Sequence, residues 1–402
     1  MMMLSACSTD GFLVKDSFLD GRGDYALSGE AGAIDGGEGS EGGGQGETSH
    51  AGILTAGEWN DLDNWPFWGN LMQMQGGEAV EGQQAPDWYS HARNWGFYTR
   101  NRVAVKVSDS EGRPVPGVTV ALSYDGKALW ETRTDIFGRA DCWAGLYDGR
   151  EFDDAGKFSI ALDGAAQESA PAVTGWTSEA VAMNEYTVQA KSVAAKADIA
   201  FVVDATGSMG DEITFLKSDL VDIFTKVGTL ETDKTIRTAA VFYRDKGDDY
   251  VTKYQDFNTD INKTSSYVKK QNAGGGGDFP EAVHTALETT LQKLSWDENA
   301  PAKLAFLILD APAHLSDSVV ESLHKSITAF AGQGIKIIPV AASGVDKSCE
   351  FMLRFFAIST GGTYAFLTDD SGVGGSHIEP TVGEFQVELL NDLVVRLISK
   401  YI

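Results

Sequence analysis

The sequence predicts a multidomain protein in which a central all-β sandwich precedes a C-terminal, doubly wound α/β domain. Two observations lead to this fold class. From residue 197 onward, apolar runs of strand length alternate with apolar residues at helical spacing, which indicates a mainly parallel sheet covered on both faces. Between residues 101 and 194, short alternating segments are separated by turn signals, as in antiparallel sandwiches.

The charge of the chain restricts what it can bind. The 402 residues carry a formal net charge of −26. Binding to a nucleic-acid backbone requires clustered Lys and Arg, so we expect no nucleic-acid partner. The charge suits cations, basic partners, or solubility alone. No apolar run approaches the ~20 residues that a membrane-spanning helix needs.

Residues 1–51 are expected to form a lipid-anchored tether. Leu4-Ser5-Ala6-Cys7 resembles a bacterial lipobox, in which the cysteine, here Cys7, carries the lipid. The following residues are rich in Gly, Asp and Glu, as in a flexible linker. The chain would then lie at a bacterial cell envelope, with membrane contact through the lipid only. Only Met1–Met3 precede this motif, where a signal peptide is expected, so either the start codon is misassigned or the chain is truncated, or the match is due to chance.

Residues 52–100 contain five of the nine tryptophans of the chain. So much aromatic surface does not stay in water, and we expect this segment to dock on the sandwich. A sugar-binding platform is the alternative, since aromatic faces also stack on flat apolar groups. The other two cysteines, Cys142 and Cys349, fall in different domains and are expected to be reduced and buried.

Residues 101–195 supply the strands of the predicted sandwich. The expected strands are Val103–Val107, Val118–Leu122, Ala128–Thr134 and Ala140–Trp143, with hairpin and turn signals at Asp125-Gly126 and Phe137-Gly138. The pattern from Val107 to Val118, followed by Thr134-Asp135-x-x-Gly138, resembles the carboxypeptidase-regulatory-like, immunoglobulin-type sandwich. That resemblance implies a spacer or docking unit.

Residues 196–402 supply the α/β domain. A first strand, Ile199–Val203, is followed by apolar residues at helical spacing from Ile213 to Val227. Further strands are expected at Ile236–Phe242, Tyr250–Tyr254, Leu304–Leu309, Lys336–Ala341 and Thr363–Leu367, with a last helix from about Val382 to Ile402. Ligands of such folds bind beyond the carboxyl ends of strands, where the strand order reverses.

Oxygen-bearing residues follow two of these strands. Asp204-Ala205-Thr206-Gly207-Ser208 leaves the first strand, and Asp310 ends the fourth. Asp278 follows a run of four glycines. Carboxylates and hydroxyls suit a hard cation such as Mg²⁺. We therefore predict one divalent-cation site, for Mg²⁺, Mn²⁺ or Ca²⁺, made by Asp204, Thr206, Ser208, Asp278 and Asp310.

These motifs resemble the von Willebrand factor type A family over about residues 195–402. The family's metal-ion-dependent adhesion site uses an Asp-x-Ser/Thr-x-Ser strand exit, a Thr from a second loop and an Asp ending the fourth strand. The resemblance implies that Asp204, Thr206 and Ser208 are first-loop ligands and that Asp310 is the fourth-strand ligand. Asp278 stands where the Thr is usual. A third carboxylate there would hold the cation firmly and weaken the binding of an acidic partner residue.

Three segments are most similar to the type A modules of some alpha-kinases and their bacterial relatives: Phe242–Asp245, Gly275–Glu281 and Leu309–His314. No kinase sequence accompanies them, so kinase activity is not expected. Arg244, Asp245 and His314 are expected near the rim of the site. Asp278-x-x-Glu281 also fits a capping box at a helix start, so Asp278 has two alternative roles.

The sequence favours a non-catalytic, cation-dependent protein-interaction module tethered at the envelope, with an unknown protein partner. One alternative is a structural or assembly lipoprotein whose cation only rigidifies loops. Another is a metal-dependent hydrolase, for which only His314 and Asp245 could supply a base.

Overall fold

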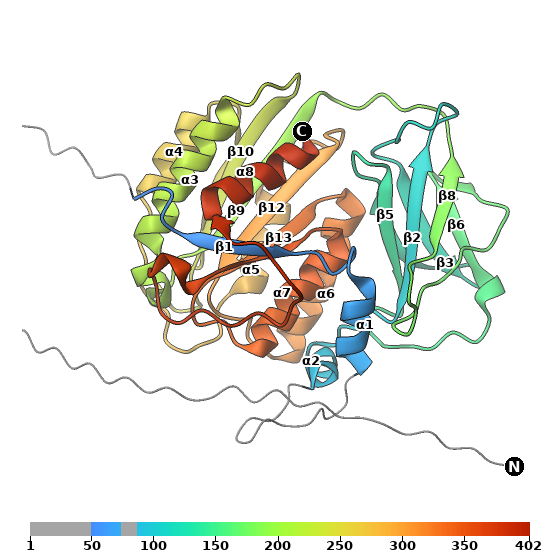
Figure 1. Ribbon diagram of the computed structural model, residues 1–402, viewed down its shortest axis with the longest axis horizontal. Helices are drawn as coiled ribbons and strands as arrows, with labels where there is room; N and C mark the ends of the chain where they lie inside the picture. The colour runs from blue at the N-terminus through green and yellow to red at the C-terminus, as the bar shows by residue number, and fades with distance from the viewer. Residues whose placement is uncertain (1–49, 74–86) are drawn as a thin grey trace, which may run out of the picture. The chain divides into compact units, whose positions relative to one another are not determined.

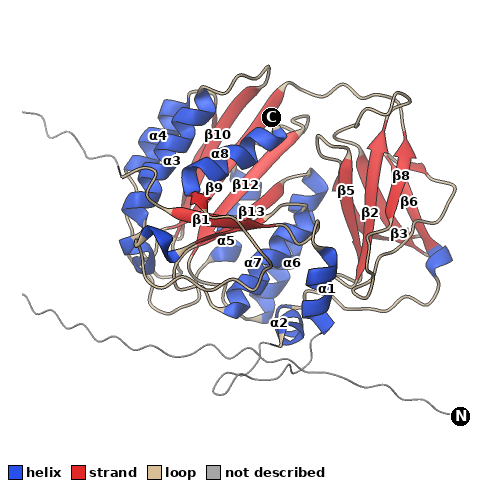
Figure 2. Ribbon diagram, in the orientation of Figure 1, coloured by secondary structure: helices blue, strands red, loops and turns tan. Residues whose placement is uncertain are grey.

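Figure 1 shows the computed structural model, in which residues 50–73 and 87–402 are described. The lipobox prediction at Cys7 lies outside the described residues. All described residues belong to one compact unit, Ser49–Ile402. That unit contains an eight-stranded sheet with helices, together with a β-rich region of two smaller sheets (Figure 2).

The large sheet carries the α/β fold. Its strand order is β11 (Thr252–Asn258), β10 (Thr235–Tyr243), β9 (Lys196–Asp204), β12 (Ala302–Leu309), β13 (Lys336–Ala341), β14 (Tyr364–Leu367), β1 (Thr55–Trp59) and β15 (Glu388–Leu389). The strands from β10 to β14 are parallel, whereas β11 and β1 pair antiparallel with their neighbours. The six strands predicted after residue 196 are all present, with slightly different ends.

Helices cover both faces of this sheet (Figure 1). One group comprises α3 (Ile213–Gly228), α4 (Ile261–Lys269) and α8 (Leu390–Tyr401), and the other comprises α5 (Val283–Lys293), α6 (Asp317–Gln333) and α7 (Lys347–Thr360). Successive side chains of a strand point to opposite faces. In β9, Phe201 and Val203 therefore join the core beneath α3 and α8, whereas Ala200 and Val202 join the other core. Burial on both faces explains the continuous apolar run of this strand.

The strand order reverses between β9 and β12. From β9 the chain moves outward to β10 and β11, and it then returns to β12 on the other side of β9. Val203 pairs with Ile308 in the parallel ladder, so the carboxyl ends of β9 and β12 lie side by side. This is the position at which open α/β sheets bind their ligands.

The β-rich region has two small sheets. One has the order β5 (Arg139–Ala144), β2 (Asn101–Ser108) and β8 (Met183–Thr187), and the other has β4 (Lys127–Arg133), β3 (Thr119–Tyr124), β6 (Phe158–Leu162) and β7 (Ala165–Ala166). The Asp125-Gly126 hairpin is confirmed, with both residues at positive φ of 49° and 72°. The two sheets contribute Val105, Leu122 and Trp143 to one buried core. A short 3-10 turn, η1 (Ala155–Lys157), precedes β6.

The tryptophan-rich segment contacts more than the β-rich region. Its first part is β1, whose backbone groups pair with the edge of β14 in the large sheet. The helices α1 (Trp65–Gln73) and α2 (Trp88–Trp95) follow. The Trp65 ring lies 5.7 Å from that of Trp143 in the β-rich region, and Trp68 stacks at 5.8 Å on Phe351 of α7. Docking on the predicted sandwich therefore accounts for only part of these contacts.

Two local predictions are wrong. The last helix begins at Leu390 rather than near Val382, because residues 382–387 are irregular and Glu388–Leu389 form β15, which pairs with β1. The capping box of Asp278 with Glu281 is not formed. Helix α5 begins at Val283, and its cap has no side-chain hydrogen bond.

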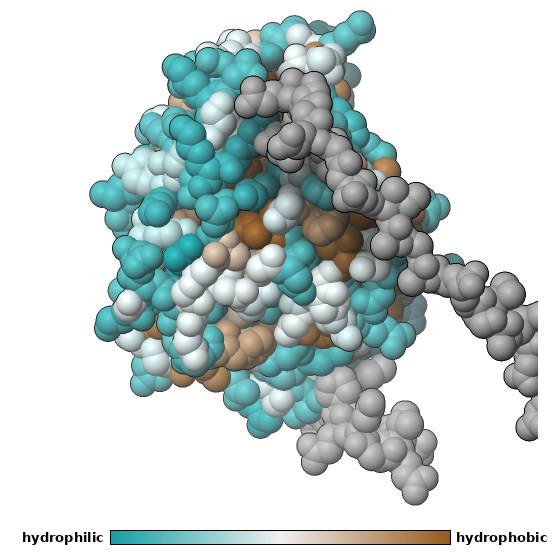
Figure 3. All heavy atoms as spheres, turned by 90° about the vertical axis from the view of Figure 1, so that its left-hand side faces the viewer, coloured by the Kyte–Doolittle hydropathy of each residue, from teal (hydrophilic) through white to brown (hydrophobic). Residues whose placement is uncertain are grey.

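Among residues 50–73 and 87–402, no helix combines the length and the apolar character of a membrane-spanning segment. The face drawn in Figure 3 is mostly hydrophilic where its surface is visible, with hydrophobic residues gathered in small patches. Cys142 and Cys349 are free and buried, as predicted.

Candidate metal centre

The first loop of the candidate site leaves the sheet at Asp204, the last residue of β9. Asp204 and Thr206 are both fully buried. The backbone N–H and the hydroxyl of Thr206 donate to Asp204 Oδ1 at 2.9 Å and 2.7 Å. The chain then turns through η2 (Gly207–Asp211), where Ser208 Oγ lies 3.1 Å from Thr206 Oγ1. Three oxygen-bearing side chains are thus held within one turn of the backbone.

Asp310 meets this loop from the end of β12. Burial, and then the charge of Asp310, raise the pKa of Asp204 to about 7. Burial likewise raises the pKa of Asp310 to about 6, although a hydrogen bond from Ser208 opposes the rise. The structure therefore brings together four of the five predicted ligands, Asp204, Thr206, Ser208 and Asp310.

Glu281 is a buried carboxylate near the first loop, and the sequence patterns did not indicate it as a site residue. Only 2% of this residue is exposed. Its backbone N–H donates to Pro312 O at 2.8 Å, which fixes it beside the loop after β12. Burial, followed by the charge of Asp204, raises the pKa of Glu281 to about 9. In the sequence, Glu281 enters only as the partner of Asp278 in a capping box, and the one local signal for another role is the Pro280-Glu281 pair after the glycine run.

A glycine makes room for this carboxylate. A Cβ atom on Gly276 would lie 2.9 Å from Glu281 Oε1 and 3.4 Å from Thr206 Cβ. Gly276 also has a φ of +72°, a conformation that L side chains rarely adopt. The glycine run thus allows Glu281 and the first loop to approach each other.

Unpaired carboxylate oxygens in this region are the observation that fits a bound cation. Asp204 Oδ2, Asp310 Oδ1 and Glu281 Oε2 are buried, and none makes a hydrogen bond within the described part of the chain. Buried charged oxygens without partners are strongly unfavourable. Oxygen ligands of this kind suit Mg²⁺, Mn²⁺ or Ca²⁺, and a cation would offset the mutual repulsion of the three groups.

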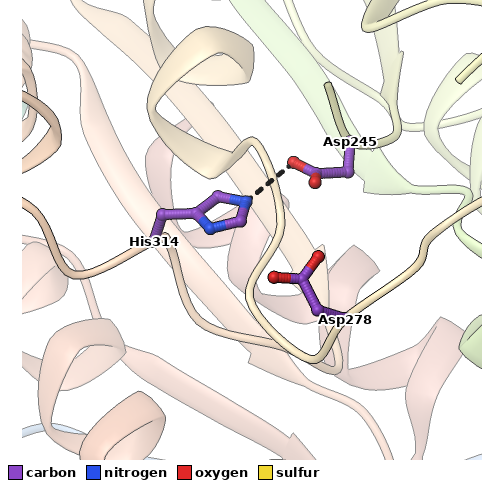
Figure 4. Close-up of side chains that lie close together, drawn as sticks. All are labelled: Asp245, Asp278 and His314. Atoms are coloured by element: carbon purple, nitrogen blue, oxygen red, sulfur yellow. Dashed lines mark hydrogen bonds and ion pairs between the residues drawn. The ribbon is translucent and has the colours of Figure 1, made fainter. Parts of the chain in front are cut away.

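Asp278 lies in a different group. Single donor atoms of Asp245, Asp278 and His314 lie within 4.8 Å of one another. Figure 4 shows the three side chains directed toward a common space. His314 Nε2 lies 2.9 Å from Asp245 Oδ1. Arg244 does not join them, because its Nε donates to Ala205 O at 3.1 Å and so ties β10 to the first loop.

Two large apolar side chains flank this group. Phe279 follows Asp278 and is 47% exposed, and Leu315 follows His314 and is 54% exposed. Few large hydrophobic residues of the described chain are so exposed. The surface beside the carboxylates therefore has apolar contact points as well as charge.

A hollow of about 810 Å³ lies elsewhere, where the β-rich region faces the α/β part. Four of its charged side chains are already paired with one another. Arg102 Nε lies 2.6 Å from Asp141 Oδ1, and Lys336 Nζ lies 3.2 Å from Asp135 Oδ2. We assign no ligand to this hollow.

Comparisons with known proteins agree with the topology. The family model described as von Willebrand factor A domain matches residues 198–346. An ariadne-like RING finger protein of Acanthamoeba polyphaga mimivirus is 28% identical over 135 residues, which are 34% of this chain and 13% of the viral protein. The match therefore spans a small part of that relative.

Among solved structures, the pilus adhesin SpaC from Lactobacillus rhamnosus GG aligns with a TM-score of 0.30 and 11% identity, over 37% of this chain and 24% of the adhesin. That likeness is too distant to support an argument about function. The strand order and the family match support one conclusion: residues 198–346 contain a von Willebrand factor A domain.

Proposed function

We propose that this protein is a divalent-cation-dependent protein-interaction module without catalytic activity, tethered at a bacterial cell envelope. The observation that carries the proposal is that Asp204, Thr206, Ser208 and Asp310 lie together at the ends of β9 and β12. One buried oxygen each of Asp204, Asp310 and the nearby Glu281 makes no hydrogen bond within the described residues. Thr206 and Ser208 complete the oxygen set. The cation, Mg²⁺ or in its place Mn²⁺ or Ca²⁺, would fix the three loops that carry these residues.

The surface beside the site supports protein binding. Phe279 and Leu315 project from loops that the cation would hold in place. Exposed aromatic and aliphatic side chains next to fixed polar groups are typical contact points of protein interfaces. A type A domain is consistent with an interaction or adhesion role. The partner is an unknown protein.

In this proposal, the parts of the chain before residue 196 hold the type A domain at the membrane. The β-rich region would be a carboxypeptidase-regulatory-like sandwich that serves as a spacer, and a lipid on Cys7 would provide the membrane anchor. Mass spectrometry of the protein purified from bacterial membranes tests the anchor. A lipid-sized mass on the peptide that contains Cys7 is expected, and it should be absent after Cys7→Ala.

A capture experiment tests the interaction. The full chain is immobilised and exposed to envelope extract with Mg²⁺ or with chelator, and captured proteins are identified. We expect a specific partner that is lost with chelator and with Asp204→Ala. Asp233→Asn is the matched control. The side chain of Asp233 is 90% exposed, and the residue precedes β10, at the end of the sheet opposite the candidate site.

One observation favours a second function, in which the cation only stabilises the loops. Asp204, Asp310 and Glu281 are 0%, 3% and 2% exposed, so the carboxylates leave little surface for a ligand from a partner. A purely structural cation would raise the melting temperature of the wild-type protein while the captured proteins stayed the same with chelator. Turnover of phosphoester or peptide substrates that is lost in Asp310→Ala would instead support a hydrolase.

A further inference from the structure

We propose that Asp245, Asp278 and His314 form a second cation site that takes a transition metal such as Zn²⁺. We call this group the outer triad. None of its three side chains is among the ligands proposed for the oxygen site of Asp204 and Asp310, while the unpaired carboxylate of Glu281 bears on both sites.

The outer triad is assembled from three separate loops. Asp245 follows β10, Asp278 follows the glycine run before α5, and His314 follows β12. All three donor atoms lie within 4.8 Å of one another. Two ligand atoms that each lie about 2.1 Å from one ion are at most ~4.2 Å apart. Side-chain movements of about half an ångström would therefore bring the three donor atoms to coordination distance. Figure 4 shows that the carboxylate of Asp278 already points toward the other two side chains.

A buried carboxylate without a partner lies behind the outer triad. Glu281 pairs through its backbone with Ala313, the residue before His314. Its Oε2 is buried and makes no hydrogen bond within the described residues. The charges of Asp204 and of Asp245 both act on Glu281. A cation at the outer triad would therefore also offset part of the charge of Glu281.

The loops of the outer triad are already held together. Asp248 Oδ2 accepts the backbone N–H of Asp245 at 3.1 Å and that of Gly276 at 2.9 Å. This single carboxylate thus links the loop of Asp245 to the glycine run that precedes Asp278. Such supporting hydrogen bonds orient metal ligands and are common around metal sites.

The donor types determine which metal would bind. Imidazole nitrogen favours Zn²⁺ and other transition metals such as Cu²⁺ and Ni²⁺, whereas Mg²⁺ and Mn²⁺ prefer oxygen ligands. The two sites should therefore be distinguished by the metal used as a probe. The alternative is an ordinary ion pair between His314 and Asp245, with Asp278 only nearby.

Calorimetry with Zn²⁺ alone and with Mg²⁺ alone tests the inference on the metal-free full chain. We expect Zn²⁺ binding to weaken at least tenfold in His314→Gln and in Asp278→Asn, while Mg²⁺ binding changes less than twofold. Asp278 is exposed, so its replacement leaves the fold intact, as circular dichroism should show. Asp249→Asn is the matched control, because it removes a 95% exposed charge from the loop that carries Asp245.

Unchanged Zn²⁺ binding in both variants would overturn the proposal, as would the absence of Zn²⁺ binding by the wild-type protein. Zn²⁺ binding that is lost in Asp204→Asn but kept in His314→Gln would place the metal at the oxygen site and also overturn it. Loss of Mg²⁺ binding alone would count against the proposed function but leave the outer triad supported.

Discussion

The guanidinium of Arg354 in α7 donates two hydrogen bonds to the carboxylate of Asp61, which lies between β1 and α1. Nε bonds to Oδ2 at 2.9 Å and Nη2 bonds to Oδ1 at 2.6 Å. Both side chains are almost completely inaccessible to solvent. The Arg354 guanidinium also lies about 5 Å above the rings of Trp68 and Trp88. The buried ion pair of Arg354 with Asp61 therefore links the tryptophan-rich segment to α7 of the α/β fold.

Removing Asp61 should therefore destabilise the whole described unit. We expect Asp61→Ala to lower the free energy of unfolding by about 3–5 kcal/mol, because it leaves the Arg354 charge buried without its main partner. Urea unfolding measures the change. The double variant Asp61→Leu/Arg354→Met should recover at least part of the loss. Asp63→Asn is the control, since its side chain is 60% exposed and it should have little effect. Equal losses for Asp61→Ala and Asp63→Asn would contradict this interpretation.

Without a divalent cation, the protein should lose stability as the pH rises. The folded-state pKa values of Asp310, Asp204 and Glu281 are raised to about 6, 7 and 9. Carboxyls with raised pKa values bind more protons in the folded state than in the unfolded state, so the free energy of unfolding falls from about pH 4 to pH 9. We expect a loss on the order of a few kcal/mol over this window.

Added Mg²⁺ should reduce this pH dependence, because a cation stabilises the ionised carboxylates. Denaturant unfolding at several pH values, with chelator and with Mg²⁺, measures both effects. In Asp204→Asn the fall should be smaller and the response to Mg²⁺ should disappear. Identical pH profiles with and without the cation would argue against a metal at these residues.

Glu281 should contribute more to Mg²⁺ affinity than Asp278 does. Glu281 is 2% exposed and interacts with Asp204, whereas Asp278 is exposed and lies with Asp245 and His314. We expect Glu281→Gln to weaken Mg²⁺ binding about tenfold or more, which corresponds to ~1.4 kcal/mol. Asp278→Asn should change it less than twofold. Titration calorimetry of both variants measures the difference. The reverse order of effects would restore Asp278 as the third carboxylate of the oxygen site.

His377 should make the loop before α8 sensitive to pH. Its Nε2 lies 3.0 Å from Glu212 Oε1, and its Nδ1 lies 2.7 Å from Asp369 Oδ1. Burial opposes protonation, but the two carboxylates together raise the pKa of His377 above its usual value. The stabilisation is therefore present below about pH 6.5 and is lost as the pH rises through the higher folded-state pKa.

Hydrogen exchange measures this effect on residues 369–377. After correction for intrinsic rates, these amides should be better protected at pH 6 than at pH 9. The difference should vanish in His377→Gln. A persistent pH dependence in that variant would show that another group controls the loop.

The sequence alone predicted the α/β topology because each layer leaves a local pattern. A strand buried on both faces, such as Ile199–Val203, must be a continuous apolar run. A helix packed on one face must repeat its apolar residues at helical spacing, as between Ile213 and Val227. Asp204 and Asp310 end such runs, and the rule that ligands bind at the carboxyl ends of strands predicted that they would meet.

Only the tertiary structure decided which further acidic residues join them. Asp278 and Glu281 are three residues apart, and this spacing alone predicts that both cap the start of a helix. The backbone pairing of Glu281 with Ala313 instead buries Glu281 beside the loop after β12, while Asp278 is exposed and lies with Asp245 and His314. Likewise, nothing near Thr55–Trp59 in the sequence shows that it pairs with β14 or that Asp61 binds Arg354. Such contacts join residues that are about three hundred positions apart in the chain. They follow from the packing of the whole chain, because local patterns record burial and secondary structure but carry no information about which distant residues meet.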